Sequence, residues 1–402
     1  MPKRKFCQFA LFAYALNYAG KKVFALFQRT VGILQKQYSV LKHDCNDNVT
    51  KNVNMELLKN SKSWWNQHYT KVMVKSIGMS LFFVYVIFPI WFYFCPWIRR
   101  QAVFLNNLNW PLHIYLSDPK NFELNCTRQF YIESEPGIYL GVWHVLPKSV
   151  TMKCNKPISP DNEFDDDRPV ILYFHGNAQN RGAKYRLSLY KVLTESKVDA
   201  HVITFDYRGY GDSSFVAPSV SGLVQDARAM YKWLKTQVKR HRIFFWGHSL
   251  GTGVVIQLAE ELGKNNDNPM AIFLEAPFTT IADATYTFPL SFLHRHMPLF
   301  HVYCSEPTRH SDTNFDSESK IGSVTVPLLF LHASDDMMVF LELGRKLFKK
   351  ALEERPSHLR RPEFIEFDYS LGYGHRNINQ DPNLPDIVVN FMQSVSMKSH
   401  LL

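Results

Sequence analysis

From residue 136 to the C-terminus, short apolar runs alternate with segments of helical periodicity. Apolar runs that do not alternate with polar residues indicate strands buried on both faces. Such strands are expected at 138–146, 169–174, 201–207, 242–247, 270–276, 326–333 and 363–369. Helices are expected between and after them, near 183–195, 219–239, 250–263, 341–352 and 385–396. The alternation predicts an α/β fold with a doubly wound, mostly parallel sheet.

A long apolar run precedes this region. Residues 77–98 are 22 consecutive positions without a charged side chain. Because about 20 apolar residues cross the hydrocarbon core of a bilayer, the run predicts a transmembrane helix over 76–98. Pro89 is tolerated in such a helix, and aromatic residues toward its end suit the membrane interface. The alternative is a buried hairpin of a soluble domain.

The positive charge of the chain lies ahead of this helix. Residues 1–75 contain 13 Lys and Arg against 3 Asp and Glu, whereas the rest of the chain contains 33 of each. Loops rich in Lys and Arg stay in the cytosol, so the N-terminus is expected there and residues 99–402 on the lumenal or extracellular side. A nucleic-acid-binding domain would carry this charge on its folded body, so no nucleic acid is expected as a partner.

These patterns predict four parts. They are a basic cytosolic segment (1–75), the transmembrane helix (76–98), a juxtamembrane segment (99–135) and an α/β domain (136–398). The first twenty residues have a basic start and an apolar middle, as in a signal peptide or a second membrane-inserting helix. We interpret them as an amphipathic segment lying on the membrane surface.

Three expected strand ends carry residues suited to nucleophilic catalysis. Ser249 lies in Gly-His-Ser-Leu-Gly between a strand and a helix, the pattern of a strained nucleophile elbow. Asp335 and Asp336 follow the strand 326–333, and His375 follows the last strand. A serine hydroxyl needs a base to take its proton, and a carboxylate to orient that base. The order Ser, Asp, His is that of α/β-hydrolases.

The choice of carboxylate rests on spacing. The pattern H-G-x-x-D-x-x-V, read from His332 to Val339, selects Asp336 over Asp335. Glu275, at the end of the preceding strand, is a weaker candidate for the acid.

Two backbone N–H groups are expected to stabilise a developing oxyanion. A His-Gly pair after the first buried parallel strand favours the N–H of Asn177 as one donor, and the N–H of Leu250 follows the nucleophile as the other. Losing one such donor costs about 3 kcal/mol of transition-state stabilisation.

The six cysteines form no C-x-x-C pair, so zinc and thioredoxin-like chemistry are not supported, and no metal or organic cofactor is implied. Cys126, Cys154 and Cys304 lie in the part expected to be lumenal and permit at most one disulfide, whose pairing is left open. Asn125 begins a glycosylation sequon that is usable only in the lumen. The sequon at Asn48 would stay silent in this topology.

The chain resembles the α/β-hydrolase-domain family of membrane-anchored serine lipases that cleave lysophosphatidylserine and monoacylglycerol. The resemblance covers most of residues 77–390 and rests on one transmembrane helix followed by LGVWHVLP, LYFHGNA, TFDYRGYGDS, WGHSLGTGV, LEAPFT, LHASDD, LGRKLF and LGYGHRNI. It implies Ser249 as nucleophile, Asp336 as acid and His375 as base. It also implies a lumen-facing catalytic domain in the endoplasmic reticulum membrane, and Asn125 falls where that family is glycosylated.

The leading hypothesis is therefore hydrolysis of lysophospholipid or monoacylglycerol esters beside a bilayer. A lid is expected at about 278–322, where apolar residues of 288–303 line an acyl tunnel or dip into the membrane, or else form an ordinary packed helix. His294, Arg295 and His296 are candidates to meet an anionic head group. The alternatives are a protein depalmitoylating thioesterase, which requires a cytosolic domain, and a non-catalytic scaffold, which usually lacks the serine or the histidine.

Overall fold

The computed structural model describes residues 68, 70–108, 115–124, 126–153 and 164–399. The chain divides into two units, Met1–Phe82 and Phe83–Leu402. The expectations for residues 1–67 lie outside the described residues. In the part of the chain that the structure describes, one helix, Thr70–Phe94, is long and apolar enough to cross a membrane.

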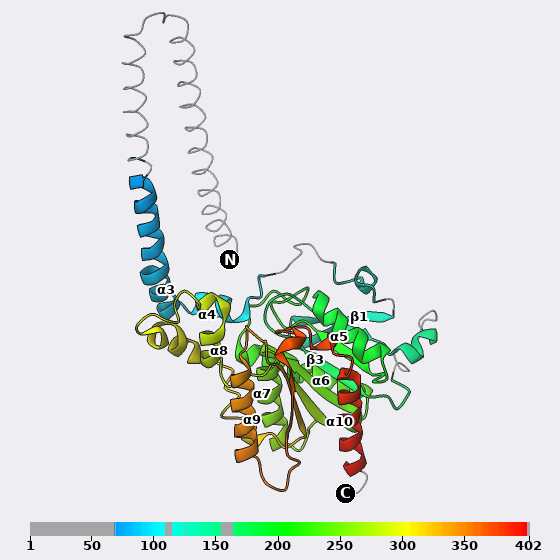
Figure 1. Ribbon diagram of the computed structural model, residues 1–402. Helices are drawn as coiled ribbons and strands as arrows, with labels where there is room; N and C mark the ends of the chain where they lie inside the picture. The colour runs from blue at the N-terminus through cyan, green and yellow to red at the C-terminus, as the bar shows by residue number, and fades with distance from the viewer. Residues whose placement is uncertain (1–67, 69, 109–114, 125, 154–163, 400–402) are drawn as a thin grey trace, which may run out of the picture. The chain divides into compact units, whose positions relative to one another are not determined.

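The second unit is built on one eight-stranded sheet (Figure 1). Its spatial order is β1-β2-β4-β3-β5-β6-β7-β8; β1 and β2 run antiparallel to their neighbours and the other strands are parallel. The bounds are β1 Thr127–Glu135, β2 Ile138–Val145, β3 Val170–Phe174, β4 His201–Phe205, β5 Ile243–His248, β6 Ala271–Glu275, β7 Leu328–Ala333 and β8 Glu363–Phe367. Strands β3 to β7 are buried along their whole length, which explains their unbroken apolar sequences.

Helices cover both faces of this sheet and bury an apolar layer on each. One layer packs residues of α6, α7 and α9 against the sheet, and the other packs residues of α5 and α10. The bounds are α5 Lys184–Glu195, α6 Val220–Gln237, α7 Leu250–Lys264, α9 Leu341–Glu354 and α10 Leu384–Ser399. The predicted doubly wound α/β architecture is therefore confirmed.

The sheet begins earlier than the sequence indicated. Strand β1 lies within the predicted juxtamembrane segment 99–135 and pairs along its length with β2. Every residue of β1 is partly or fully exposed, so the strand has no continuous apolar run that sequence analysis could detect. Its place at the sheet edge explains this composition, because an edge strand packs on one side only.

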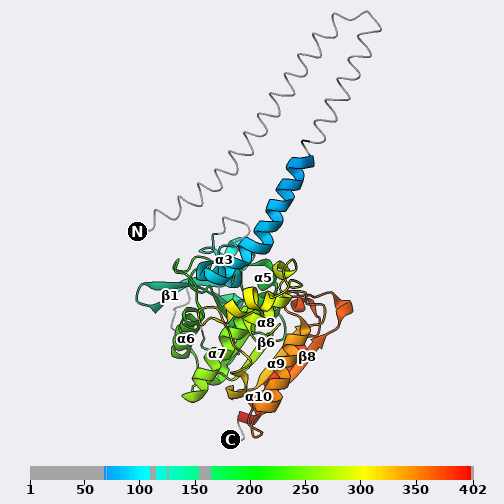
Figure 2. The same cartoon turned by 90° about the vertical axis from the view of Figure 1, so that its left-hand side faces the viewer.

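The carboxyl ends of the parallel strands face a set of short helices (Figure 2). From the N-terminal side come a π-helical turn η1 (Phe83–Ile87), α3 (Phe88–Phe94) and α4 (Pro96–Phe104). From residues 278–322, the predicted lid and called the lid below, come α8 (Ile281–Thr287) and the helical turns η6 (Pro289–Ser291), η7 (His301–Ser305) and η8 (Glu306–Arg309). Both α8 and α3 contact η7, so the last part of the long apolar helix packs directly against the lid.

Candidate active site

Ser249 lies at the turn that joins β5 to α7. Its backbone has φ 52° and ψ −120°, a conformation that non-glycine residues avoid and that concentrates at functional sites. The flanking glycines are required by space. A Cβ on Gly251 would lie 2.0 Å from the carbonyl oxygen of Phe174, and one on Gly247 would lie 2.7 Å from the carbonyl oxygen of Gly251. This strained strand-to-helix turn has the form of a nucleophile elbow.

His375 and Asp336 meet although 39 positions separate them in the chain. Nδ1 of His375 lies 2.7 Å from Oδ2 of Asp336, and both side chains are almost wholly buried. The other carboxylate oxygen, Oδ1, accepts hydrogen bonds from the backbone N–H groups of Met338 (2.8 Å) and Val339 (2.9 Å). The carboxylate is thus fixed on both oxygens and orients the imidazole, so that its Nε2 is left for chemistry.

These contacts keep Asp336 ionised. Burial by itself raises the pKa of Asp336, but the charge of His375 and hydrogen bonds from His332 and His375 outweigh it, and the pKa lies well below its ordinary value. A permanently charged carboxylate can stabilise the imidazolium that forms when His375 takes a proton.

Asp335 has a different partner. Both of its carboxylate oxygens lie 2.9 Å from the backbone nitrogen of Gly374, the residue before His375. Gly374 has φ +53°, so the loop turns sharply there and the Asp335 carboxylate holds the turn in place. Asp336 therefore contacts the histidine ring, whereas its neighbour Asp335 anchors the histidine loop.

Two further side chains, those of His248 and Glu275, support the site. The sequence analysis did not predict these contacts. Nε2 of His248 lies 2.9 Å from the carbonyl oxygen of His375, so it donates to the histidine loop. Glu275 accepts a hydrogen bond from Nε1 of Trp246 at 2.7 Å. Burial, together with the nearby charge of Asp336, raises the pKa of Glu275 to about 8, so this side chain is mostly neutral at pH 7.

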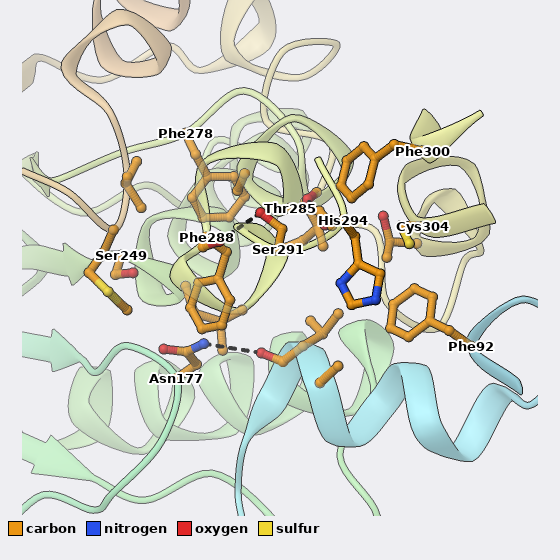
Figure 3. A pocket seen from close by; sticks show the side chains of 18 of the residues that line it. Phe92, Asn177, Ser249, Phe278, Thr285, Phe288, Ser291, His294, Phe300 and Cys304 are labelled. Carbon is orange, nitrogen blue, oxygen red and sulfur yellow. Dashed lines mark hydrogen bonds between the residues drawn. The ribbon is translucent and has the colours of Figure 1, made fainter. Parts of the chain in front are cut away.

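Ser249 and His375 line one apolar cavity together with Asn177 and Leu250 (Figure 3). The side-chain amide of Asn177 donates to the carbonyl oxygen of Val103 at 3.3 Å, which fixes this residue at the cavity wall. Leu250 is the first residue of α7, and the first N–H groups of a helix have no partner within it. All four residues that sequence analysis placed at the reacting carbonyl therefore border the same space.

The cavity is apolar. Its volume is about 150 Å³. Its apolar lining comes from the lid, from the helices that precede the sheet and from the loop between β7 and α9, and includes Phe88, Phe92, Ala102, Val103, Phe278, Ile281, Ala284, Phe288, Phe300, Met338 and Val339. Ser249 thus lies at the wall of a cavity lined mainly by apolar side chains.

The lid differs from one expectation. His294 is buried, and its Nε2 lies 2.8 Å from the backbone carbonyl oxygen of Val84, so it is not available to an anionic head group. Arg295 and His296 contact each other at the surface, where Arg295 Nε lies 3.3 Å from His296 Nε2. These two residues therefore remain candidates to bind an anionic head group.

The remaining sequence predictions have different outcomes. Asn125 lies outside the described residues. Cys126 is disulfide-bonded, whereas Cys304 is a buried free thiol, so these two are not paired with each other. Within the described ranges, no group of three or more His, Cys, Asp and Glu is placed to hold a metal ion.

Known proteins resemble this chain along most of its length. The lysophosphatidylserine lipase ABHD12 of Danio rerio is 37% identical over 323 residues, which are 80% of this chain and 84% of the relative. The protein of the same name from Bos taurus is 38% identical over 320 residues, 78% of this chain and 79% of the relative. The human protein ABHD12B is 33% identical over 294 residues, 73% of this chain and 79% of the relative.

Solved structures share the fold at low sequence identity. An α/β hydrolase from Vibrio vulnificus superposes with a TM-score of 0.55 at 17% identity and covers 73% of this chain and 92% of its own. The Pyrococcus furiosus esterase Pf2001 superposes with a TM-score of 0.51 at 19% identity and covers 71% and 97%. A family model described as alpha/beta hydrolase fold matches residues 169–294. The chain belongs to the α/β-hydrolase family that includes the lysophosphatidylserine lipase ABHD12.

Proposed function

We propose that this protein is a serine hydrolase that cleaves the acyl ester of lysophosphatidylserine, with monoacylglycerol as a second substrate. The observation that carries the proposal is that Ser249 and the Asp336-paired His375 border one apolar cavity. The relatives named as lysophosphatidylserine lipases support the choice of head group.

In the proposed first step, Oγ of Ser249 attacks the ester carbonyl carbon while Nε2 of His375 takes its proton. The N–H groups of Asn177 and Leu250 donate to the carbonyl oxygen as it becomes negative. Asp336 stabilises the resulting imidazolium through Nδ1. The tetrahedral intermediate then collapses, the bond to the glycerol oxygen breaks, and His375 gives the proton to that oxygen.

In the second step, water attacks the acyl-enzyme. His375 removes a proton from the water, and the same N–H groups stabilise the second oxyanion. The bond to Ser249 breaks, Oγ recovers its proton from His375, and the free fatty acid leaves. No other reactant is needed, so the two steps sum to hydrolysis of the ester.

The proposal places the enzyme in the endoplasmic reticulum membrane, with residues 1–75 in the cytosol and residues 99–402 in the lumen. The apolar helix Thr70–Phe94 supports anchoring. The disulfide at Cys126 supports an oxidising compartment, since disulfides are rare in the cytosol. Glycosylation of Asn125 tests the orientation: a glycosidase should increase the gel mobility of the wild type and leave Asn125→Gln unchanged.

The activity is tested with the full chain in detergent micelles that contain lysophosphatidylserine, with mass spectrometry of the released fatty acid. Ser249→Ala should lower the release by about 10⁴-fold or more, because it removes the nucleophile. A fatty acyl thioester peptide serves as the comparison substrate. Faster turnover of that peptide than of the lipid would favour a thioesterase, and no turnover of either substrate by folded protein would refute the proposal.

A further inference from the structure

The wall of the cavity opposite Ser249 is formed by the segment that ends the apolar helix. Phe88 and Phe92 of α3 and Ala102 and Val103 of α4 line the cavity. Phe92 is almost fully buried, and Figure 3 shows its ring beside His294, away from Ser249. The cavity is therefore closed by residues that lie ahead of the α/β domain in the chain.

A defined polar contact attaches this segment to the lid. In a π-helical turn, the carbonyl of Val84 would accept a hydrogen bond from the N–H of residue 89. Residue 89 is a proline and has no N–H to donate. Nε2 of His294 donates to that carbonyl at 2.8 Å instead. The His294 ring also packs against the rings of Tyr85 and Phe88, with centroid distances of 5.7 and 5.5 Å. The lid thus satisfies a backbone group that the proline has freed.

A second contact fixes the end of α3. The guanidinium of Arg99 is buried and donates to the carbonyl oxygens of Phe92, at 3.1 Å, and of Tyr93. A cation at a helix C-terminus is favoured both by the unpaired carbonyls and by the helix dipole. Because Arg99 and Arg100 end the uncharged run, they place this end of the helix at the membrane surface.

The lid surface near this helix end is apolar as well. Phe292, Leu293 and Leu299 are each more than half exposed, and Trp91 and Phe94 of α3 are exposed on the helix. Apolar side chains exposed beside a membrane-crossing helix are suited to the acyl region of a bilayer. The lid and α3 therefore carry apolar side chains on the cavity side and on the exposed surface.

We propose that α3 is the distal part of an acyl-chain subsite, formed by Phe88 and Phe92 against the lid and occupied by a single long acyl chain that enters from the membrane. This inference rests on the proposed function and goes beyond it, because it makes residues of the membrane anchor determinants of acyl-chain length. Long chains reach the wall formed by Phe92, whereas short chains end near Ser249. The anchor is then part of the substrate-binding site as well as a tether.

The test compares two phenylalanines of the same helix. Phe92 is 5% exposed and lines the cavity, whereas Phe94 is 75% exposed and faces outward. For the full chain in detergent micelles, kcat/KM is measured for 18-carbon lysophosphatidylserine and for 4-nitrophenyl butyrate. Rates are expressed per active site titrated with a small fluorophosphonate, so that misfolded protein is not counted.

Phe92→Ala should lower the ratio of long-chain to short-chain kcat/KM by about tenfold, as expected when several apolar contacts to a substrate are lost. Phe94→Ala should leave this ratio within about twofold of the wild type. Phe92→Trp keeps the packing but narrows the cavity, and should shift the preference toward shorter acyl chains across a chain-length series.

The outcomes separate the two proposals. An unchanged ratio in both Phe92 variants, in a protein that hydrolyses the esters, would overturn the acyl subsite and leave the proposed function intact. An equal effect of Phe92→Ala and Phe94→Ala on the ratio would also overturn it, because it would indicate a general effect of the helix. A wild type that hydrolyses neither ester would instead refute the proposed function.

Discussion

Among the buried histidine–aspartate pairs of the described residues, two lie at opposite ends of the sheet. At the carboxyl ends of the parallel strands, His375 Nδ1 lies 2.7 Å from Asp336. At the start of β4, His201 Nε2 lies 3.1 Å from Asp166. The two pairs are similar in contact and burial, so neither property identifies a catalytic site.

The pairs differ in what surrounds them. The second ring nitrogen of His201 contacts the Nε2 of His144 at 2.9 Å, and Asp166 also accepts from Arg242 at 2.8 Å. Burial, and then the neighbouring His144, lower the pKa of His201 to about 4, so it stays neutral at pH 7. His375 instead borders a cavity that it shares with Ser249. A histidine–aspartate pair is suited to catalysis where the histidine borders a cavity together with a nucleophile.

The strongest test of this comparison is the same substitution in both pairs. Asp336→Asn should lower kcat by about 10³- to 10⁴-fold, because an amide can leave His375 in the wrong tautomer and cannot stabilise its charge. Asp166→Asn should leave kcat within about threefold of the wild type. Both are measured on lysophosphatidylserine hydrolysis. Comparable losses in the two variants would show that Asp336 acts through stability alone.

A smaller effect is expected from the aspartate that anchors the histidine loop. Asp335→Ala removes the acceptor for the Gly374 N–H and should lower kcat by about tenfold, equivalent to roughly 1.4 kcal/mol. Rescue by Asp335→Asn, which keeps an acceptor oxygen, would distinguish loop positioning from loss of charge. A loss as large as that of Asp336→Asn would contradict the separate tasks of the two aspartates.

The pair at the amino end should matter for stability. Asp166→Ala leaves Arg242 and His201 without this partner in a largely buried position, and such a loss costs about 1–3 kcal/mol. We expect the Tm to fall by about 5 °C, measured by differential scanning fluorimetry. An unchanged Tm would indicate that His201 and Arg242 find other partners.

The last effect concerns pH. Glu275 keeps its proton in the folded protein up to about pH 8, whereas a carboxyl in an unfolded chain loses it near pH 4.5. Between these values the unfolded chain binds fewer protons, so this residue lowers the free energy of unfolding as the pH rises, by up to about 1.4 kcal/mol per pH unit. Glu275→Gln keeps an acceptor for Trp246 and removes this slope.

The Glu275→Gln variant should therefore have a Tm close to that of the wild type at pH 5 and a higher Tm at pH 8. The comparison at two pH values cancels the other titrating groups, which both proteins share. The same difference in Tm at both values would show that Glu275 is ionised in the folded protein.

The sequence predicts every strand of the sheet except the edge strand β1. Strands such as β3 and β5 are buried on both faces, so their apolar runs show their positions directly. Strand β1 was missed because it is an exposed edge strand without such a run. The strand ends also brought Ser249, Asp336 and His375 together, since the carboxyl ends of parallel strands share one edge.

Other features depend on contacts between distant segments, which a single sequence does not contain. Spacing alone favoured Asp336, but it did not indicate that the Asp335 carboxylate accepts a hydrogen bond from the N–H of Gly374. The His294 side chain was expected to be available to a head group, and it bonds to Val84 more than 200 positions away. The sequence also did not indicate that Phe92 forms part of the cavity wall.

The most direct test of the central claim is to map the serine that reacts. The full-length protein in micelles is treated with a fluorophosphonate, digested, and analysed by peptide mass spectrometry. We predict one adduct, on Ser249, which forms in Asp166→Asn at the wild-type rate and is strongly slowed in Asp336→Asn. Modification of a different serine, or no adduct on folded protein that still releases fatty acid, would contradict the account.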